Sequence, residues 1–256
     1  MTATLACVGG LLGLVAGSFI NVLAHRVPLG LSVLRPRSTC PACGHETRAG
    51  DSVPLLSWLL LRGHCRDCGA AISVRYPLVE VGTAAAFAGL ALLVGASWAL
   101  PGYWWAAAAA IALTLTDLDC RRIPDRILMP GIVGAAALLS LGSVLEGDPW
   151  AIVRALAGGA GYFGVLLAVA VAARGGFGFG DVKLGFLLGL VLAHRSWGVL
   201  LVGAFAAFAV GGLAAVALLA ARRVSRKDAI PFGPAMVAGA GLALALGDTI
   251  ARWYLG

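Results

Sequence analysis

Two aspartates lie where apolar segments meet polar ones, an uncommon place for a carboxylate. Asp117 ends the apolar run 109–116, and Asp181 follows the glycine-rich segment 175–180 directly before another apolar run. An ionisable side chain beside hydrocarbon is costly and is therefore a functional candidate. Two such carboxylates, if brought together, would share a proton, so that one activates water and the other protonates a scissile carbonyl. Helix-end carboxylates that face water are the alternative, and Asp119 is too close to Asp117 for sequence chemistry to separate them.

Glycine is concentrated in the segment that leads to Asp181. Gly178 and Gly180 would let a substrate backbone pass close to the carboxylate, because glycine has no side chain, and we expect them to form a substrate loop. The sequence contains neither HExxH nor GxSxG, and its four histidines are expected in separate loops, with His194 among them. Aspartates are therefore the groups left for a membrane hydrolase.

Four of the six cysteines form two CxxC pairs with 21 residues between them. The pairs are Cys40 with Cys43 and Cys65 with Cys68. Two such pairs can close a tetrahedral thiolate cage around zinc, and a glycine directly after each pair suits the tight turn of a zinc knuckle. Four sulfur ligands leave no open position, so the metal is expected to be structural. Two disulfides are the alternative, which a reducing compartment disfavours.

The composition predicts an integral membrane protein. Of the 256 residues, 60% are hydrophobic and 12% charged, and the mean hydropathy is +0.93, whereas soluble domains are about 25% charged. We expect an all-α protein with about eight spans of roughly 20 residues each. The apolar runs are 3–24, 77–95, 103–116, 127–145, 152–173, 182–193, 198–221 and 232–254. The run 182–193 is short, so it either recruits neighbours or does not cross fully. The first run lacks the features of a cleaved signal and should stay attached.

Lysine and arginine lie mainly in alternate connections between these runs. With the N-terminus outside, 16 of the 19 Lys and Arg residues fall in the inner segments 25–76, 117–126, 174–183 and 222–229. Because positive charge accumulates on the cytoplasmic side of membrane proteins, we expect the cysteine loop and both aspartates at the cytoplasmic face. The net charge of +7 is thus a topology signal, and the expected partner is the lipid bilayer, not nucleic acid.

An ordered set of motifs resembles the prepilin peptidase family, the type IV leader peptidases, over almost the whole chain. After the segment 17–26 and the two CxxC pairs, the set comprises Arg75-Tyr-Pro77-Leu-Val-Glu80, Asp117-Leu-Asp119, Ile123-Pro124-Asp125, Gly178-Phe-Gly180-Asp181-Val-Lys183 and Pro231-Phe-Gly233-Pro234. The resemblance implies an aspartyl endopeptidase of the GxGD group, in the bacterial inner membrane, with Asp117 and Asp181 as the catalytic pair. Its substrates would be type IV prepilins and pseudopilins, which carry a basic leader and a transmembrane helix and serve pilus assembly or protein secretion.

Many members of this family also methylate the new N-terminus with S-adenosylmethionine. The resemblance ties Gly63 and Glu80 to that activity, although a turn glycine and a helix-end carboxylate explain these residues equally well. The connection from Val27 to Thr39 is shorter than in many members. The alternatives are a peptidase without methylase activity, a proton-coupled transporter, which would hold its carboxylates near the midplane, and a zinc-loop scaffold. The predicted domains are a first transmembrane helix (1–24), a zinc loop (25–76) and a multi-helix peptidase domain (77–256).

Overall fold

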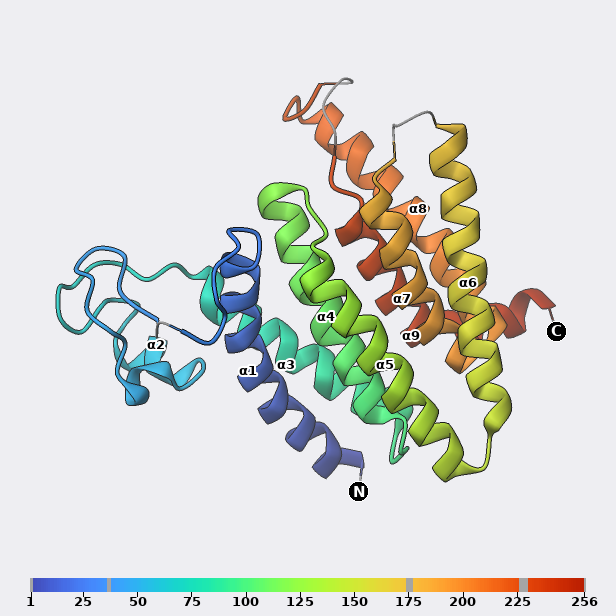
Figure 1. Cartoon of the computed structure of the whole chain (residues 1–256), viewed down its shortest axis with the longest axis horizontal. Coiled ribbons are helices and arrows are strands. Elements are labelled where there is room, and N and C mark those ends of the chain that lie inside the picture. Colours follow the sequence, from blue (N-terminus) through green and yellow to red (C-terminus); the bar gives the residue numbers. More distant parts are fainter. Residues whose placement is uncertain (1, 36–37, 174–176, 226–229, 256) are drawn as a thin grey trace. The chain divides into compact units, whose positions relative to one another are not determined.

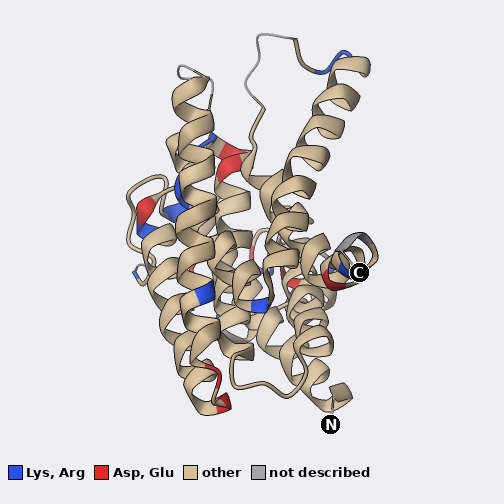
Figure 2. Cartoon of the chain, turned by 90° about the vertical axis from the view of Figure 1, so that its right-hand side faces the viewer, with Lys and Arg blue, Asp and Glu red and all other residues tan. Residues whose placement is uncertain are grey.

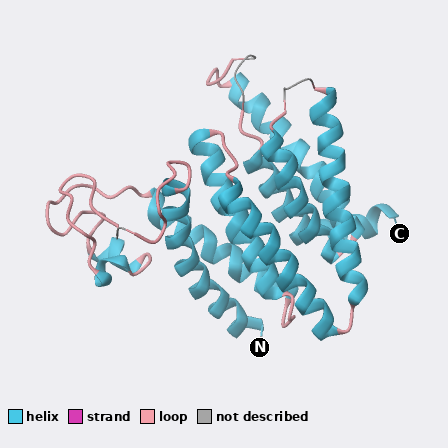
Figure 3. Cartoon of the chain, in the orientation of Figure 1, coloured by secondary structure: helices cyan, strands magenta, loops and turns pink. Residues whose placement is uncertain are grey.

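The computed structural model describes residues 2–35, 38–173, 177–225 and 230–255, and these residues are almost entirely helices and loops (Figure 1). The long helices are α1 (Thr2–Arg26), α3 (Arg75–Val94), α4 (Leu100–Cys120), α5 (Asp125–Glu146), α6 (Pro149–Ala172), α7 (Phe179–Arg195), α8 (Trp197–Ala220) and α9 (Gly233–Leu255). Two short helical turns, η1 (Ala49–Ser52) and α2 (Leu56–Leu60), interrupt the long loop between α1 and α3 (Figure 3). The all-α fold class is confirmed.

Each predicted span coincides with one long helix. Six of them, α1, α3, α5, α6, α8 and α9, are long and apolar enough to cross a membrane, whereas α4 and α7 do not meet this criterion. With 17 residues, α7 is about 25 Å long, which is shorter than a hydrocarbon core of roughly 30 Å. As one of the two expected outcomes, the helix extends beyond the predicted run 182–193 at both ends. The expectation that His25 and His194 lie in loops is wrong, because α1 continues to Arg26 and α7 continues to Arg195, where it buries His194.

The first of two units, Met1–Ala96, is built on the antiparallel pair of α1 and α3. Glycines on α1 let the two backbones touch. A Cβ atom on Gly13 would lie 2.6 Å from Ala84 Cα, and one on Gly17 would lie 2.6 Å from Glu80 Cα, so no side chain fits at either position. Small residues therefore set the pairing that brings the two ends of the long loop together.

In the second unit, Ser97–Gly256, the other long helices pack around α7. Helix α7 contacts α4, α5, α6, α8 and α9, and every residue from Leu187 to His194 is buried. The approach of α6 depends on glycine, since a Cβ atom on Gly189 would lie 2.7 Å from Gly158 O. The last turns of α4, α6 and α8 and the first turns of α5, α7 and α9 gather at one end of the unit (Figure 1).

Charged residues are sparse along the helices (Figure 2). Of the basic residues that predict the orientation, Arg37, Arg174, Arg226 and Lys227 lie outside the described residues. The remaining acidic and basic groups stand mostly near helix ends, where they reach water or each other. This distribution fits helices whose flanks face lipid.

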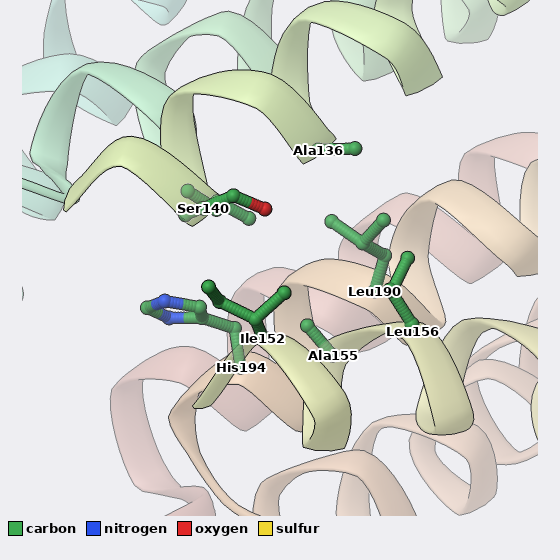
Figure 4. A pocket seen from close by; sticks show the side chains of 8 residues that line it. Ala136, Ser140, Ile152, Ala155, Leu156, Leu190 and His194 are labelled. Atoms are coloured by element: carbon green, nitrogen blue, oxygen red, sulfur yellow. The ribbon is translucent and has the colours of Figure 1, made fainter. Parts of the chain in front are cut away.

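A buried polar cluster lies near the last turn of α7, about 20 Å along the helix from Asp181. The Tyr103 hydroxyl is 2.8 Å from Nδ1 of His194 and the Ser143 hydroxyl is 2.9 Å from Nε2. Arg154 donates hydrogen bonds to the carbonyl oxygens at the end of the same helix. The adjoining pocket between α5, α6 and α7 is small and mostly apolar (Figure 4). Because both ring nitrogens already have partners, this cluster stabilises the bundle and leaves no free base for a substrate.

Candidate active site

Asp117 lies in the last turn of α4, at the end of the unit where three helix pairs meet. The helix ends at Cys120, and the next residue, Arg121, has a left-handed backbone (φ 53°) and donates its N–H to the Asp117 carbonyl at 2.9 Å. The Asp117 side chain is 5% exposed, and its Oδ2 accepts a hydrogen bond of 3.0 Å from the backbone N–H of Gly233, the first residue of α9. A helix N-terminus favours negative charge. The start of α9 therefore fixes one carboxylate oxygen and its orientation.

Asp181 lies in the first turn of α7, three residues after Gly178, which precedes that helix in an extended conformation. A Cβ atom on Gly178 would come within 3.0 Å of Asp181 Oδ2, so a larger residue would crowd the carboxylate. Among the described residues, Asp181 Oδ1 is buried and has no hydrogen-bond partner. A buried oxygen without a partner is rare in folded proteins. It is the atom of this site that could hold a proton or a water molecule.

The structure brings the two aspartates together from helices that are far apart in sequence. Helix α4 packs against α7, and the charge of Asp117 acts on the Asp181 carboxyl group. Asp119, two residues after Asp117, is exposed, because residues two apart point to different sides of a helix. The geometry therefore supports Asp117, not Asp119, as the partner of Asp181.

The short connection between α4 and α5 holds these two helix ends against α7. A Cβ atom on Gly180 would lie 2.9 Å from Ile123 Cβ, so glycine lets the start of α7 rest on this connection. Lys183, one turn further along α7, forms an ion pair with Asp125 at the start of α5. The Lys183 ammonium also lies 5.4 Å from the centre of the Phe179 ring. These contacts tie the segment after Asp117 to the helix that carries Asp181.

The four cysteines of the two CxxC pairs form one cluster in the loop of the first unit. Their sulfur atoms all lie within 4.8 Å of one another, and Cys40 Sγ and Cys68 Sγ are 3.8 Å apart. A zinc–sulfur distance of about 2.3 Å gives a tetrahedron with edges of about 3.8 Å. All six cysteines of the chain are free thiols. The donor set and its spacing therefore fit a metal ion better than disulfide bonds.

The two CxxC pairs lie in two separate backbone turns of the same kind. Cys40 N–H donates to His45 O at 2.9 Å and Cys65 N–H donates to Ala70 O at 2.8 Å. The glycines that follow the pairs, Gly44 and Gly69, have φ values of +74° and +69°, which glycine adopts without strain. Each pair therefore lies in the tight turn that the glycine after it predicted.

The electrostatics of the loop suit a cation at the cluster. The backbone N–H groups of Cys43 and Ala42 lower the pKa of the Cys40 thiol to about 6. The N–H of Ala70 acts in the same sense on Cys68, but desolvation and hydrogen bonds with the other thiols raise the pKa of Cys68 to about 12. The thiols thus share protons that a bound metal ion would displace.

Two models of protein families match most of this chain. Residues 11–94 match the model of the bacterial peptidase A24 N-terminal domain, and residues 104–217 match that of the type IV leader peptidase family. A prepilin leader peptidase/N-methyltransferase of Aeromonas hydrophila is 34% identical over 96% of this chain and 92% of its own. Proteins of the same description are 34% identical in Bacillus subtilis, over 95% of both chains, and 37% identical in Pseudomonas putida, over 93% of this chain and 90% of the relative. This chain belongs to the type IV leader peptidase family. No solved structure matches it.

In this family member the two residues tied by resemblance to methylation have structural contacts in the first unit. Glu80, in the second turn of α3, is 7% exposed and accepts a hydrogen bond of 2.6 Å from Leu55 N–H. Gly63 has a φ of +71°, and a Cβ atom there would lie 2.9 Å from the Trp58 ring. Both residues shape the loop around α2, and their role in methyl transfer stays a prediction.

Sequence reasoning missed two features of the leader peptidase site. It quoted Gly233, Asp125 and Lys183 as parts of motifs but assigned none of them a role. A signal for the ion pair was present, since Lys183 is one of two lysines in the chain and follows Asp181 by two residues. The hydrogen bond from Gly233 to Asp117 joins residues 116 positions apart, and no local pattern predicts such a contact.

Proposed function

We propose that this leader peptidase family member is a membrane aspartyl endopeptidase that removes the leader of type IV prepilins or pseudopilins. The observation that carries the proposal is the meeting of Asp117 and Asp181 at one end of the second unit. Two carboxylates that lie close together hold one proton between them, because like charges side by side cannot both ionise cheaply. The pair then offers a base and an acid at the same time.

In the proposed reaction, one aspartate takes a proton from a water molecule, which attacks the carbonyl carbon of the scissile bond. The other aspartate protonates the carbonyl oxygen, and the C–N bond breaks as the leaving amine takes up a proton from the pair. Gly233 N–H keeps Asp117 in position, and the buried Oδ1 of Asp181, which has no hydrogen-bond partner among the described residues, is available for the proton or the water. Gly178 and Gly180 are proposed to leave room for the extended substrate backbone.

The reaction is proposed to occur at the cytoplasmic face of the bacterial inner membrane, with the N-terminus of the chain outside. The basic residues near the dyad support this orientation, since Arg121 and Arg122 lie in the α4–α5 connection, Arg126 in the first turn of α5 and Lys183 in α7. A basic leader would remain on that side, while the apolar helix of the substrate stays in the bilayer. By the same rule, the zinc loop lies on the cytoplasmic side.

Cys40, Cys43, Cys65 and Cys68 are proposed to hold one zinc ion. With four thiolate ligands the metal would order a loop that contains little helix, and it would have no position left for a substrate. The ion pairs Arg66–Asp51 (2.6 Å) and Arg48–Asp67 (3.2 Å) join residues of the two halves of the loop. These ion pairs stabilise the same fold of the loop independently of the metal.

Methylation of the new N-terminus is the second proposed activity, and it is supported by the names of the relatives. S-adenosylmethionine would supply the methyl group. Gly63 and Glu80 are the residues proposed to matter for it, by shaping the loop around α2. No other residue of the chain is proposed to act in methylation.

The test is leader cleavage by purified protein in vesicles, followed by mass spectrometry of a prepilin substrate. Asp117→Asn and Asp181→Asn should each abolish cleavage, whereas Asp119→Asn, the matched control at an exposed carboxylate, should retain it. A further mass gain of about 14 Da, one methyl group, that requires S-adenosylmethionine would establish the methylase. Cleavage that persists in both Asp117→Asn and Asp181→Asn would refute the dyad.

A further inference from the structure

Helix α2 in the long loop presents an apolar face that the described residues leave exposed. Leu56, Leu59 and Leu60 follow the i, i+3, i+4 spacing of one helix side, and they are 53%, 54% and 73% exposed. Trp58 points the other way, since its indole N–H donates to Ile72 O at 3.2 Å and its ring lies against Gly63. The helix therefore has one side fixed to the loop and one apolar side turned outward.

The position of α2 along the neighbouring span is set by a hydrogen bond. Leu55, directly before α2, donates its N–H to Glu80 at 2.6 Å, and Glu80 lies five residues into α3, a depth of about 7.5 Å along its axis. Tyr76, at the start of α3, is 48% exposed, and tyrosine is enriched where a helix enters the headgroup layer. Because α3 is long and apolar enough to cross a membrane, α2 begins at the level of the lipid boundary, not out in the water.

Charge at the two ends of this segment agrees with that depth. Arg62 follows α2 and is exposed, and Arg75 opens α3. Helices that lie in the plane of a membrane place leucines among the acyl chains and arginines among anionic headgroups. Leu55 itself has an unusual backbone (φ 61°, ψ −50°), and its bond to Glu80 holds the chain in the turn from which α2 starts.

We propose that α2 lies flat in the interface of an anionic bilayer, with Leu56, Leu59 and Leu60 inserted among the lipid chains. The zinc loop is then anchored to the membrane at three points, namely α1, α3 and α2. This anchor is separate from the proposed peptidase site and does not depend on it. Glu80 acts in it as a positioning residue, because it sets the depth at which α2 begins.

The experiment uses the full chain in vesicles of phosphatidylethanolamine and phosphatidylglycerol. The photoreactive residue benzoylphenylalanine replaces Leu59 in one sample and the exposed Glu46 of the same loop in the control, and adducts are identified by mass spectrometry. Lipid adducts should be at least about tenfold more abundant at position 59 than at position 46. Adding Leu56→Ser and Leu60→Ser should reduce the adducts at position 59 to the level of the control, with the protein yield in the membrane unchanged.

Two results would overturn the proposal. Adducts from position 59 to another peptide of the chain would mean that protein covers the leucines. Equal lipid adducts at positions 59 and 46 would mean that α2 stands no closer to the bilayer than the rest of the loop. Leader cleavage is measured on the same samples, so a failed anchor is distinguishable from a failed peptidase.

Discussion

Replacing Gly233 by alanine tests how the site holds Asp117. In the structure, Gly233 N–H donates to Asp117 Oδ2 at 3.0 Å, and a Cβ atom on Gly233 would lie 2.8 Å from the same oxygen. A carbon and an oxygen atom do not approach that closely without a shift. The carboxylate must therefore rotate or move away, and the hydrogen bond to it is lost.

The size of the effect follows from that hydrogen bond. A hydrogen bond to a charged group contributes about 1.5–3 kcal/mol, and each 1.4 kcal/mol changes a rate by about tenfold. We expect Gly233→Ala to lower kcat for leader cleavage by about tenfold to a hundredfold. KM should change little, because in the proposed reaction Asp117 acts on the scissile bond only.

The assay is the rate of leader removal over a range of substrate concentrations, with equal amounts of enzyme in the membrane. Gly241→Ala is the matched control, since it lies in the same helix and a Cβ atom there would have no neighbour within 4 Å. It should cleave at the rate of the unmodified protein. If Gly233→Ala also keeps a kcat within about twofold of that rate, the N–H of Gly233 does not orient Asp117.

Three further predictions concern the elements around the two sites. Asp125→Asn or Lys183→Met should each lower the cleavage rate about twofold to fivefold, because a partly exposed ion pair contributes up to about 1 kcal/mol. The reciprocal exchange Asp125→Lys with Lys183→Asp should recover most of the loss, and equal losses in all three would argue against pairing. Removal of the metal with a chelator, or by acid that protonates the thiolates, should expose the loop to trypsin while the long helices stay protected; a loop equally resistant without metal would contradict this. Gly17→Leu should destabilise the α1–α3 pair by about 1–3 kcal/mol in thermal melts. Gly10→Ala is the control and should be tolerated, because a Cβ atom there has its nearest neighbour at 4.0 Å. An unchanged melting temperature for Gly17→Leu would mean that the two helices do not pack this closely.

The helices were predictable because the signal for each is local. A long apolar run must satisfy its own backbone hydrogen bonds in lipid, and a helix does so within the run. All eight runs are therefore helical in the structure, and the short run 182–193 grows to Phe179–Arg195 because the flanking residues can continue the same hydrogen bonds. His194 was wrongly predicted to lie in a loop, because the local sequence shows only a polar residue after an apolar run. Its partners, Tyr103 and Ser143, lie in other helices.

The site features could likewise be predicted only where their sequence signal is local. The cysteine cluster could be predicted, because the ligands lie in two short repeats and each turn is marked by its own glycine. The choice of Asp117 over Asp119 came from the family pattern, because it depends on which side of α4 meets α9. The contact of Glu80 with Leu55 and of Gly233 with Asp117 joins distant segments, so only the folded chain reveals them. The division into residues 1–24, 25–76 and 77–256 stays a prediction.

The shortness of α7 has a consequence for the substrate. Helix α7 is about 25 Å long and carries Asp181 in its first turn. Centred in a hydrocarbon core of roughly 30 Å, it would hold that residue within about 6 Å of one edge of the core. A bond cut at its first turn would lie at the edge of the hydrocarbon. Unwinding a peptide deep in lipid costs several kcal/mol for each backbone group that loses its partner. An enzyme that cuts at the edge avoids this cost, because a peptide segment there is already in contact with water, and a helix on its lipid side can keep its own hydrogen bonds.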